Sequence, residues 1–417
     1  MKTIYQLALQ VLAVLVIAGC AEQKLGTISN DQASTESLDV LTLAERAGAP
    51  LFDGMGDYEM PITTEEQDAQ RYFNQGMVLA FAFNHAESIR SFRAAQTLDP
   101  TCAMCFWGEA LATGPNINVT SKGKVIMSAA EREAAFAALQ KALALKDNAT
   151  LREQAYIEAL ATRYNGDANS DREPLDRAWA QAMGSVAKQY PEDMTAASIY
   201  AESLMNTMPW NYWSDDGIAK PETSSVIESL DRVLAAEPEH PLALHLYIHA
   251  LEASNDPSRA ESAADRLAHL VPGAGHLVHM PSHIYYRIGR YNDAAAANQR
   301  AADVDEAYIA ACNAQGFYPA LYYPHNIHFL WSAATMQGQS ALSIESARRV
   351  VANVRVEQVQ AFPTVEFFRT VPLLSLVRFA KWDDILQEPH PHEGFMSPSL
   401  FGTTRGVLPM RRRVSRC

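Results

Sequence analysis

The sequence predicts an all-α solenoid, a row of helix-turn-helix units in which each unit packs mainly against its neighbours. Two observations support this prediction. Segments with the length and apolar spacing of helices follow one another over residues 130–145, 151–164, 174–189 and 194–208. In addition, Pro238 and Pro272 each close a helix-like apolar run and stand 34 residues apart. A period of this length is typical of paired helices that stack to bury a common core.

The turns inside these units resemble those of a known repeat. Gly289, Tyr291 and Ala294 have the spacing of the turn between the two helices of a tetratricopeptide repeat. The first unit begins near Ala69 and carries matching residues at repeat positions 4, 8, 24, 27 and 32, namely Tyr72, Gly76, Phe92, Ala95 and Pro100. The stretches FNHAES (83–88), CAMCFWG (102–108) and HMPSHIYYRIGRY (279–291) are similar to those of secreted bacterial tetratricopeptide proteins. The resemblance covers most of residues 65–386 and implies a tetratricopeptide-like (TPR-like) α-solenoid.

The N-terminus has the pattern of a processing segment. Lys2 precedes an apolar run over residues 4–17, which ends in Ala18-Gly19-Cys20. A run of this length is typical of a signal peptide and too short for a membrane-spanning helix. The small residues before Cys20 resemble the lipobox of bacterial lipoproteins, which implies cleavage before Cys20 and a lipid on it. An ordinary secretory signal with an incidental cysteine is the alternative.

This pattern leads to an expected domain organisation and location. We expect a signal peptide at 1–19, a lipidated cysteine and tether at 20–64, a solenoid at 65–386, and an irregular tail at 387–417 that looks truncated relative to the family. Ala21 after the cysteine resembles cargo of the outer membrane. We therefore expect an extracytoplasmic protein, facing the periplasm, that contacts the membrane only through its N-terminal lipid.

Composition limits the classes of partner. The chain is 48% hydrophobic and 20% charged, and its net charge is −14. A core-forming body fits the first two values. Nucleic-acid binding depends on clustered Lys and Arg, so the negative charge argues against it.

Histidines form the main candidate site. When Pro238 and Pro272 are taken as repeat position 32, and Gly338 as position 15, seven of the twelve histidines fall at positions 2, 5 and 9 of consecutive repeats: His245, His249, His276, His279, His283, His325 and His328. The resemblance implies that positions 2, 5, 9, 12 and 13 line a concave groove. In an earlier repeat, Glu202 falls at position 9 and Asn206 at position 13. Arg287 falls at position 13 of the repeat that contains His283. These three residues complete the expected groove-binding set.

One interpretation of the groove is a metal site. His245/His249 and His279/His283 have the i, i+4 spacing with which two imidazoles on one helix can bind one ion. Three histidines with Glu202, or four histidines, would complete a shell for Zn²⁺ or Cu²⁺. Water on such an ion could act as a nucleophile, so a metal-dependent hydrolase is included in this interpretation. No HExxH motif is present, since Leu246 follows His245 and Met280 follows His279.

The other interpretation is a binding scaffold. Most proteins of this repeat class bind extended peptides or protein tails, so the resemblance implies a protein or peptide partner, or a small ligand, in the histidine-lined groove. Arg287 could receive a carboxylate of such a partner. The third interpretation is a purely structural role, in which the histidines only hydrogen-bond to neighbours inside the fold.

Cys102 and Cys105 form a CxxC pair at the start of a helix-like segment. Such a pair can close a disulfide, act as a redox pair or supply two metal ligands. Outside the cytoplasm a structural disulfide is the ordinary expectation. Haem attachment is excluded because Phe106, and not His, follows the second cysteine.

Overall fold

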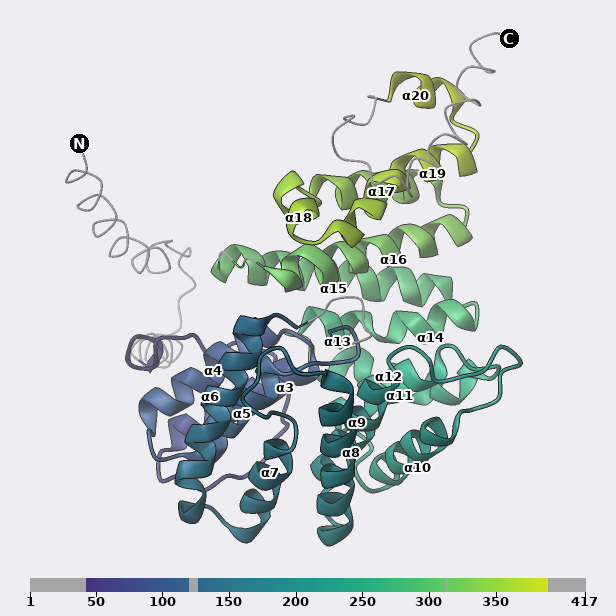
Figure 1. Cartoon of the computed structure of the whole chain (residues 1–417). Helices are drawn as coiled ribbons and strands as arrows, with labels where there is room; N and C mark the ends of the chain where they lie inside the picture. The colour runs from purple at the N-terminus through teal and green to yellow at the C-terminus, as the bar shows by residue number, and fades with distance from the viewer. Residues whose placement is uncertain (1–42, 120–126, 313, 315, 389–417) are drawn as a thin grey trace, which may run out of the picture.

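The protein is an all-α stack of antiparallel helix pairs, a TPR-like α-solenoid (Figure 1). The computed structural model describes residues 43–119, 127–312, 314 and 316–388. Apart from isolated β-bridges, the regular elements of these ranges are helices. The predicted fold class is therefore confirmed, while the expected signal peptide, Cys20 and the tail beyond Glu388 lie outside the described residues.

Successive helices form the pairs of the solenoid. In chain order the pairs are α3 (Gln67–Phe81) with α4 (His85–Leu98), α5 (Ala103–Thr113) with α6 (Ala129–Leu145), α7 (Leu151–Ala161) with α8 (Arg172–Gln189), α9 (Met194–Thr207) with α10 (Pro221–Ala236), and α11 (Pro241–Leu251) with α12 (Glu261–Leu270). The next helix position is divided between α13 (Gly275–His279) and α14 (Pro281–Arg287), which pair with α15 (Tyr291–Cys312). Then follow α16 (Tyr323–Met336) with α17 (Ser340–Ala352), α18 (Val356–Ala361), and α19 (Val371–Arg378) with α20 (Trp382–Gln387). Short helical turns η1 (Lys146–Asn148), η2 (Pro257–Ala260), η3 (Tyr318–Tyr322) and η4 (Pro363–Thr370) connect them.

Pro281 explains the division between α13 and α14. Proline has no N–H to donate to the preceding turn, so an i to i−4 hydrogen bond is missing at this point. Met280 nevertheless keeps helical backbone angles, with φ −50° and ψ −41°. The helical path therefore continues through the proline, and His279 and His283 stay on one face.

Two segments with helical apolar spacing near the C-terminus are not single α-helices. Within residues 340–356, α17 ends at Ala352 and α18 begins at Val356. The segment 365–380 begins as the 3-10 helix η4, and only its second half is the α-helix α19. Pro363 and Pro372 stand at the starts of these two elements, where a missing N–H costs least.

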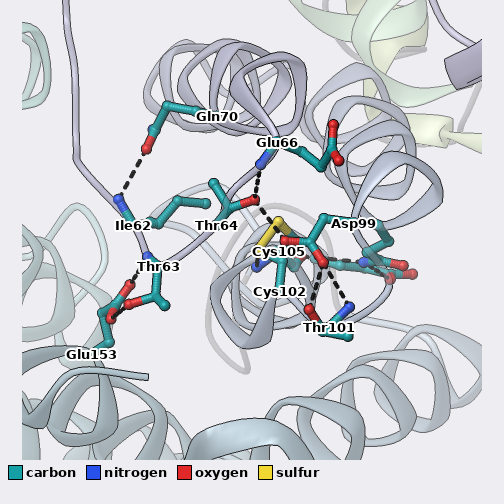
Figure 2. The surroundings of a disulfide bond; sticks show 12 residues. Ile62, Thr63, Thr64, Glu66, Gln70, Asp99, Thr101, Cys102, Cys105 and Glu153 are labelled. Carbon is teal, nitrogen blue, oxygen red and sulfur yellow. Dashed lines mark hydrogen bonds between the residues drawn. A yellow bond between two sulfur atoms is a disulfide. The ribbon is translucent and has the colours of Figure 1, made fainter. Parts of the chain in front are cut away.

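Residues 43–64 pack against the solenoid, so the expected tether does not extend to residue 64. Leu43 and Met60 are buried, and the Tyr72 hydroxyl donates to the carbonyl of Ala49 at 2.5 Å. Figure 2 shows the end of this segment, where the backbone N–H and the hydroxyl of Thr63 both donate to Glu153 at 2.6 Å. These hydrogen bonds attach the segment 43–64 to α7.

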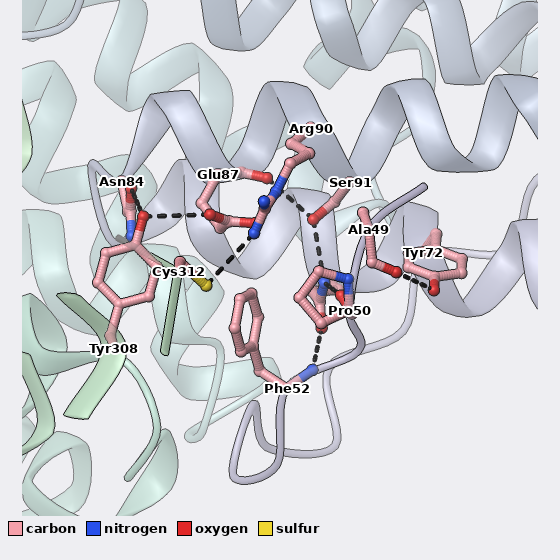
Figure 3. A network of polar contacts seen from close by, with 11 residues as sticks. Ala49, Pro50, Phe52, Tyr72, Asn84, Glu87, Arg90, Ser91, Tyr308 and Cys312 are labelled. Atoms are coloured by element: carbon pink, nitrogen blue, oxygen red, sulfur yellow. Dashed lines mark hydrogen bonds and ion pairs between the residues drawn. The ribbon is translucent and has the colours of Figure 1, made fainter. Parts of the chain in front are cut away.

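The solenoid curls until its first repeat meets its sixth. α3 packs against α11, and α4 reaches α15 through polar contacts that Figure 3 shows. There the Tyr308 hydroxyl donates to Glu87 at 3.1 Å, and the Arg90 guanidinium lies 3.3 Å from the Cys312 sulfur. The first repeat therefore covers the concave side of the helices that carry the histidines.

Among the residues that the structure describes, no helix combines the length and the apolar character needed to cross a membrane.

Candidate metal centre

Six of the seven predicted groove histidines meet in the interior, in two groups that we call the first and the second triad. The first triad is His245, His249 and His276, and the second is His279, His283 and His325. Within each triad the ligand atoms lie within 4.8 Å of one another. The side chains come from α11, α13, α14 and α16, which stack side by side. Five of the six histidines are at least nine-tenths buried, and His325 is partly buried.

Phe83 covers the first triad from the side of the first repeat. Its ring centroid lies 4.6 Å from that of His245 and 5.5 Å from that of His276. Phe83 has a φ of 56° in the turn after α3, a left-handed conformation that is uncommon for an aromatic residue. The predicted trough is thus an enclosed core in this structure and not an open groove.

Hydrogen bonds fix the tautomers of four histidines. The Nδ1 of His245 faces the carbonyl oxygen of Phe81 at 2.6 Å, so it must donate. The Nδ1 atoms of His249 and His283 face the two carboxylate oxygens of Glu252, each at 2.7 Å. A neutral imidazole that donates from Nδ1 carries a lone pair on Nε2. Each of these rings therefore presents Nε2 as an acceptor or a metal ligand.

His279 follows the same rule through an amide. Its Nδ1 lies 2.6 Å from the Asn298 side-chain oxygen. The Asn298 amide nitrogen donates to the carbonyl of Ala294 at 2.7 Å, which fixes the orientation of the amide and leaves its oxygen for His279. His279 thus donates from Nδ1 as well.

The Nε2 atoms of His279 and His283 lie 2.9 Å apart. Both rings already donate from Nδ1, so two lone pairs face each other across this distance. Either one ring holds a second proton or a cation lies between them. Two nitrogens bound to one ion at about 2.0–2.1 Å would stand about 2.9–3.4 Å apart, so the spacing suits two ligands of one ion.

Burial favours the neutral form of three of these histidines. Desolvation lowers the pKa of His245, His276 and His279 well below the ordinary histidine value, and the neighbouring imidazoles lower it further. Glu252 behaves in the opposite way. Burial raises its pKa, but the charge of His283 and the hydrogen bonds from His249 and His283 lower it more, so the net pKa falls well below the usual range. The site thus combines buried imidazoles with one carboxylate anion.

Two histidines of the first triad hold buried nitrogen atoms without a protein partner. These atoms are Nε2 of His245 and both ring nitrogens of His276; outside the triads, Nε2 of His328 is a further such atom. A buried polar atom left in this way costs about 1–3 kcal/mol. A metal ion inside the first triad would bind Nε2 of His245 and one nitrogen of His276, which removes the cost at those two atoms, so the donor set fits a metal.

The other predicted site residues lie outside the two triads. His328 packs against Trp331, Phe367 and Phe368, and burial lowers its pKa to about 4. Arg287 donates to the backbone carbonyls of Glu252 and Ser254 and so supports the end of α11.

Glu202 and Asn206, on α9, belong to a separate environment. Burial raises the pKa of Glu202 to about 7, and the positive charge of Arg163 lowers it only in part. Asn206 is buried, and neither polar atom of its side chain has a hydrogen-bond partner. The carboxylate that contacts the histidines is Glu252, where Glu202 was expected.

Glu252 and Asn298 were missing from the predicted set. Glu252 follows His249 by three residues and stands at repeat position 12, one of the positions expected to face the concave side. That position was a usable signal for Glu252. Asn298 lies on α15, the second helix of its pair, and a rule limited to first helices could not find it.

The Cys102–Cys105 pair forms a disulfide at the start of α5. Figure 2 places it beside Asp99 and Thr64. The sulfur of Cys102 also accepts the backbone N–H of Cys105 and caps the helix. The two sulfurs are bonded to each other and take no part in the triads.

Comparisons with known proteins add little. No protein-family model and no curated protein matches the chain. Among solved structures, yeast Tom70 is similar at 10% identity over 78% of this chain and 84% of that chain, with a TM-score of 0.27. The tetratricopeptide (TPR) domain of P58(IPK) is similar at 13% identity over 84% of this chain and 98% of that chain, with a TM-score of 0.20. The fold class therefore rests on the helix pairs and the period of this chain itself.

Proposed function

We propose that this protein binds a transition-metal ion of the zinc or copper class through its buried histidines. The main observation in support is that the Nε2 atoms of His279 and His283 lie 2.9 Å apart. The Nδ1 atoms of both rings donate to other acceptors. Histidine ligands in metal sites typically donate the other ring N–H to a carboxylate, carbonyl or similar acceptor. Four rings of this cluster follow that arrangement.

A shared proton is the competing explanation for the close nitrogens. It requires an imidazolium ion in the interior: burial opposes a second proton on His279, while a second proton on His283 would lie on a ring that faces the carboxylate of Glu252. Glu252 offers one negative charge, which already accepts from His249 and His283. A metal ion satisfies both lone pairs without a buried proton. The all-nitrogen donor set selects Zn²⁺ or Cu²⁺ over Mg²⁺ or Ca²⁺, which prefer oxygen.

Binding is proposed ahead of hydrolysis and ahead of a peptide groove. Hydrolysis would need a carboxylate able to take a proton beside the ion, and both oxygens of Glu252 accept from histidines. A protein or peptide partner would have to displace Phe83 and the first repeat to reach the rings. We further propose that a lipid on Cys20 holds the protein outside the cytoplasm, where the Cys102–Cys105 disulfide is stable.

The test is metal content measured by elemental mass spectrometry on the mature chain without an affinity tag. The protein is stripped with chelator, incubated with Zn²⁺ or Cu²⁺ and dialysed. We expect at least one ion per chain, and fewer bound ions in His279→Gln/His283→Gln at unchanged helicity. His328→Gln, which changes a histidine outside the triads, is the matched control and should keep the ion.

Two results would overturn the proposal. One is a wild-type chain that stays at the chelator baseline after loading. The other is equal metal content in the double variant and the wild type. Either result would favour the binding scaffold, whose partner protein cross-linking would then identify.

A further inference from the structure

We infer that the histidine cluster holds two transition-metal ions, one in each triad, and that Glu252 couples them. This inference rests on the proposed metal binding and deepens it. It concerns the number of ions and the residue that connects them.

The repeat period duplicates the site. The first triad takes positions 5 and 9 of one repeat, His245 and His249, and position 2 of the next, His276. The second triad takes positions 5 and 9 of that next repeat, His279 and His283, with His325 at position 2 of the following repeat. Solenoid repeats are related by a similar small rotation at each step. The same three repeat positions therefore come together twice. The packing that brings the histidines of one triad together also brings together those of the other.

Six imidazoles exceed the need of a single ion. A tetrahedral Zn²⁺ takes four ligands, and an open site takes three from the protein. The two triads are nevertheless adjacent, because the ring centroids of His249 and His283 lie 5.4 Å apart and those of His276 and His279 lie 5.7 Å apart. This spacing suits a two-metal centre, in which ions stand about 3.5–4 Å apart.

Glu252 connects the triads through one carboxylate. One oxygen accepts from His249 of the first triad and the other from His283 of the second. Each triad also has an acceptor of its own, the carbonyl of Phe81 for His245 and the Asn298 side chain for His279. Removing the shared acceptor should therefore weaken both sites, while removing Asn298 should weaken only one.

The experiment is a Zn²⁺ titration of the chelator-stripped full chain by calorimetry, with bound metal counted by elemental mass spectrometry. We expect two ions per wild-type chain and one in His245→Gln and in His325→Gln. Glu252→Gln should lower both affinities by roughly 10- to 100-fold, the usual effect of losing a partner of a ligating histidine. Asn298→Ala should lower one affinity only. His328→Gln, the control, should keep two ions at wild-type affinity.

Copper loading gives a second readout that does not depend on counting. Two neighbouring Cu²⁺ ions interact magnetically, so the wild type should give a broadened or weakened electron paramagnetic resonance signal. His245→Gln should give the ordinary signal of an isolated ion. Circular dichroism of each variant checks that the helices remain.

The outcomes separate the two proposals. Saturation at one ion, or loss of the same single ion in both His245→Gln and His325→Gln, would overturn the two-ion inference and leave metal binding in place. Absence of any bound ion would overturn both.

Discussion

His328 occupies the same repeat position as His245 and His279, yet its surroundings give it another role. It packs against Trp331, Phe367 and Phe368, and burial lowers its pKa to about 4. The neutral ring is a partly buried side chain that packs among aromatic rings. Position within the repeat thus predicts where a histidine stands on its helix, while the neighbouring elements decide whether other histidines reach it.

His328→Leu should make the protein more resistant to acid. The pKa is about 6.5 in the unfolded chain and about 4 in the folded one, so the unfolded state binds more protons as the pH falls below 6.5. The wild type therefore loses stability on acidification, by about 2 kcal/mol at pH 5 for this group. We expect the variant to be within about 1 kcal/mol of the wild type at pH 7.5, in line with other hydrophobic replacements of similar volume.

Urea unfolding in the presence of chelator, followed by circular dichroism at pH 7.5 and pH 5.0, measures this effect. His269→Leu, on α12 and also outside the triads, is a control for the loss of a histidine as such. An equal decrease in the urea midpoint of wild type and His328→Leu between the two pH values would contradict the prediction.

Glu202 and Glu252 mark the limit of prediction at the scale of residues. Both stand at positions expected to face the concave side, positions 9 and 12. The period assigns both to these positions on their helices. It could not say that Arg163 would be the charge near Glu202, or that His283 would approach Glu252 from the next repeat, because these contacts depend on the packing between repeats.

At the scale of elements, helix packing depends on small residues that could be recognised in the sequence. Gly76 and Gly108 belong to the stretches that resemble the repeat family, and both lie against the ring of Phe92. A Cβ added to Gly108 would stand 2.3 Å from a ring atom of Phe92, and one added to Gly76 would stand 2.8 Å from it. The close approach of α3, α4 and α5 thus requires glycine at these two positions. Helix ends were harder to predict, since the breaks near Pro281 and Pro363 depend on local backbone geometry.

Gly108→Ala should destabilise the first repeats. Alanine is favoured over glycine in a helix by about 1 kcal/mol, but the clash with the buried Phe92 ring forces α4 and α5 apart. Overpacking of this kind typically costs about 1–3 kcal/mol and sometimes more, so a net loss is expected. Thermal unfolding measures it.

A second background shows whether the loss comes from this contact. Phe92→Leu removes the ring, so adding Gly108→Ala to Phe92→Leu should cost less than it does in the wild type. A gain in melting temperature from Gly108→Ala alone would show that the ring moves away at no cost, against the prediction.

At the scale of the whole molecule, the curl of the solenoid decides what the histidines can do. Repeat similarity predicts contacts between neighbours in sequence, and these were found. The meeting of the first repeat with the sixth depends on small rotations that add over many repeats, and no local pattern encodes their sum. Tyr308 and Glu87, which join α15 to α4 in Figure 3, carry no motif that would have identified them as partners. The open groove was therefore expected and an enclosed core was found.

This closure leads to a prediction about metal binding at a distance along the chain. The ligands lie on α11, α13, α14 and α16, but the carbonyl of Phe81 accepts from His245 and the ring of Phe83 packs on the first triad. Ion binding should therefore slow amide hydrogen exchange at the end of α3 and the start of α4, although those helices supply no ligand. Saturation at 100 times the dissociation constant stabilises the bound state by about 2.7 kcal/mol, so exchange there should slow by up to about 100-fold where opening requires release of the ion. Exchange in α6, which packs mainly against α5 and α7, serves as the internal control. Slowing confined to α11–α16 would mean that the first repeat opens independently, and the enclosed core would then have a route by which ligands enter.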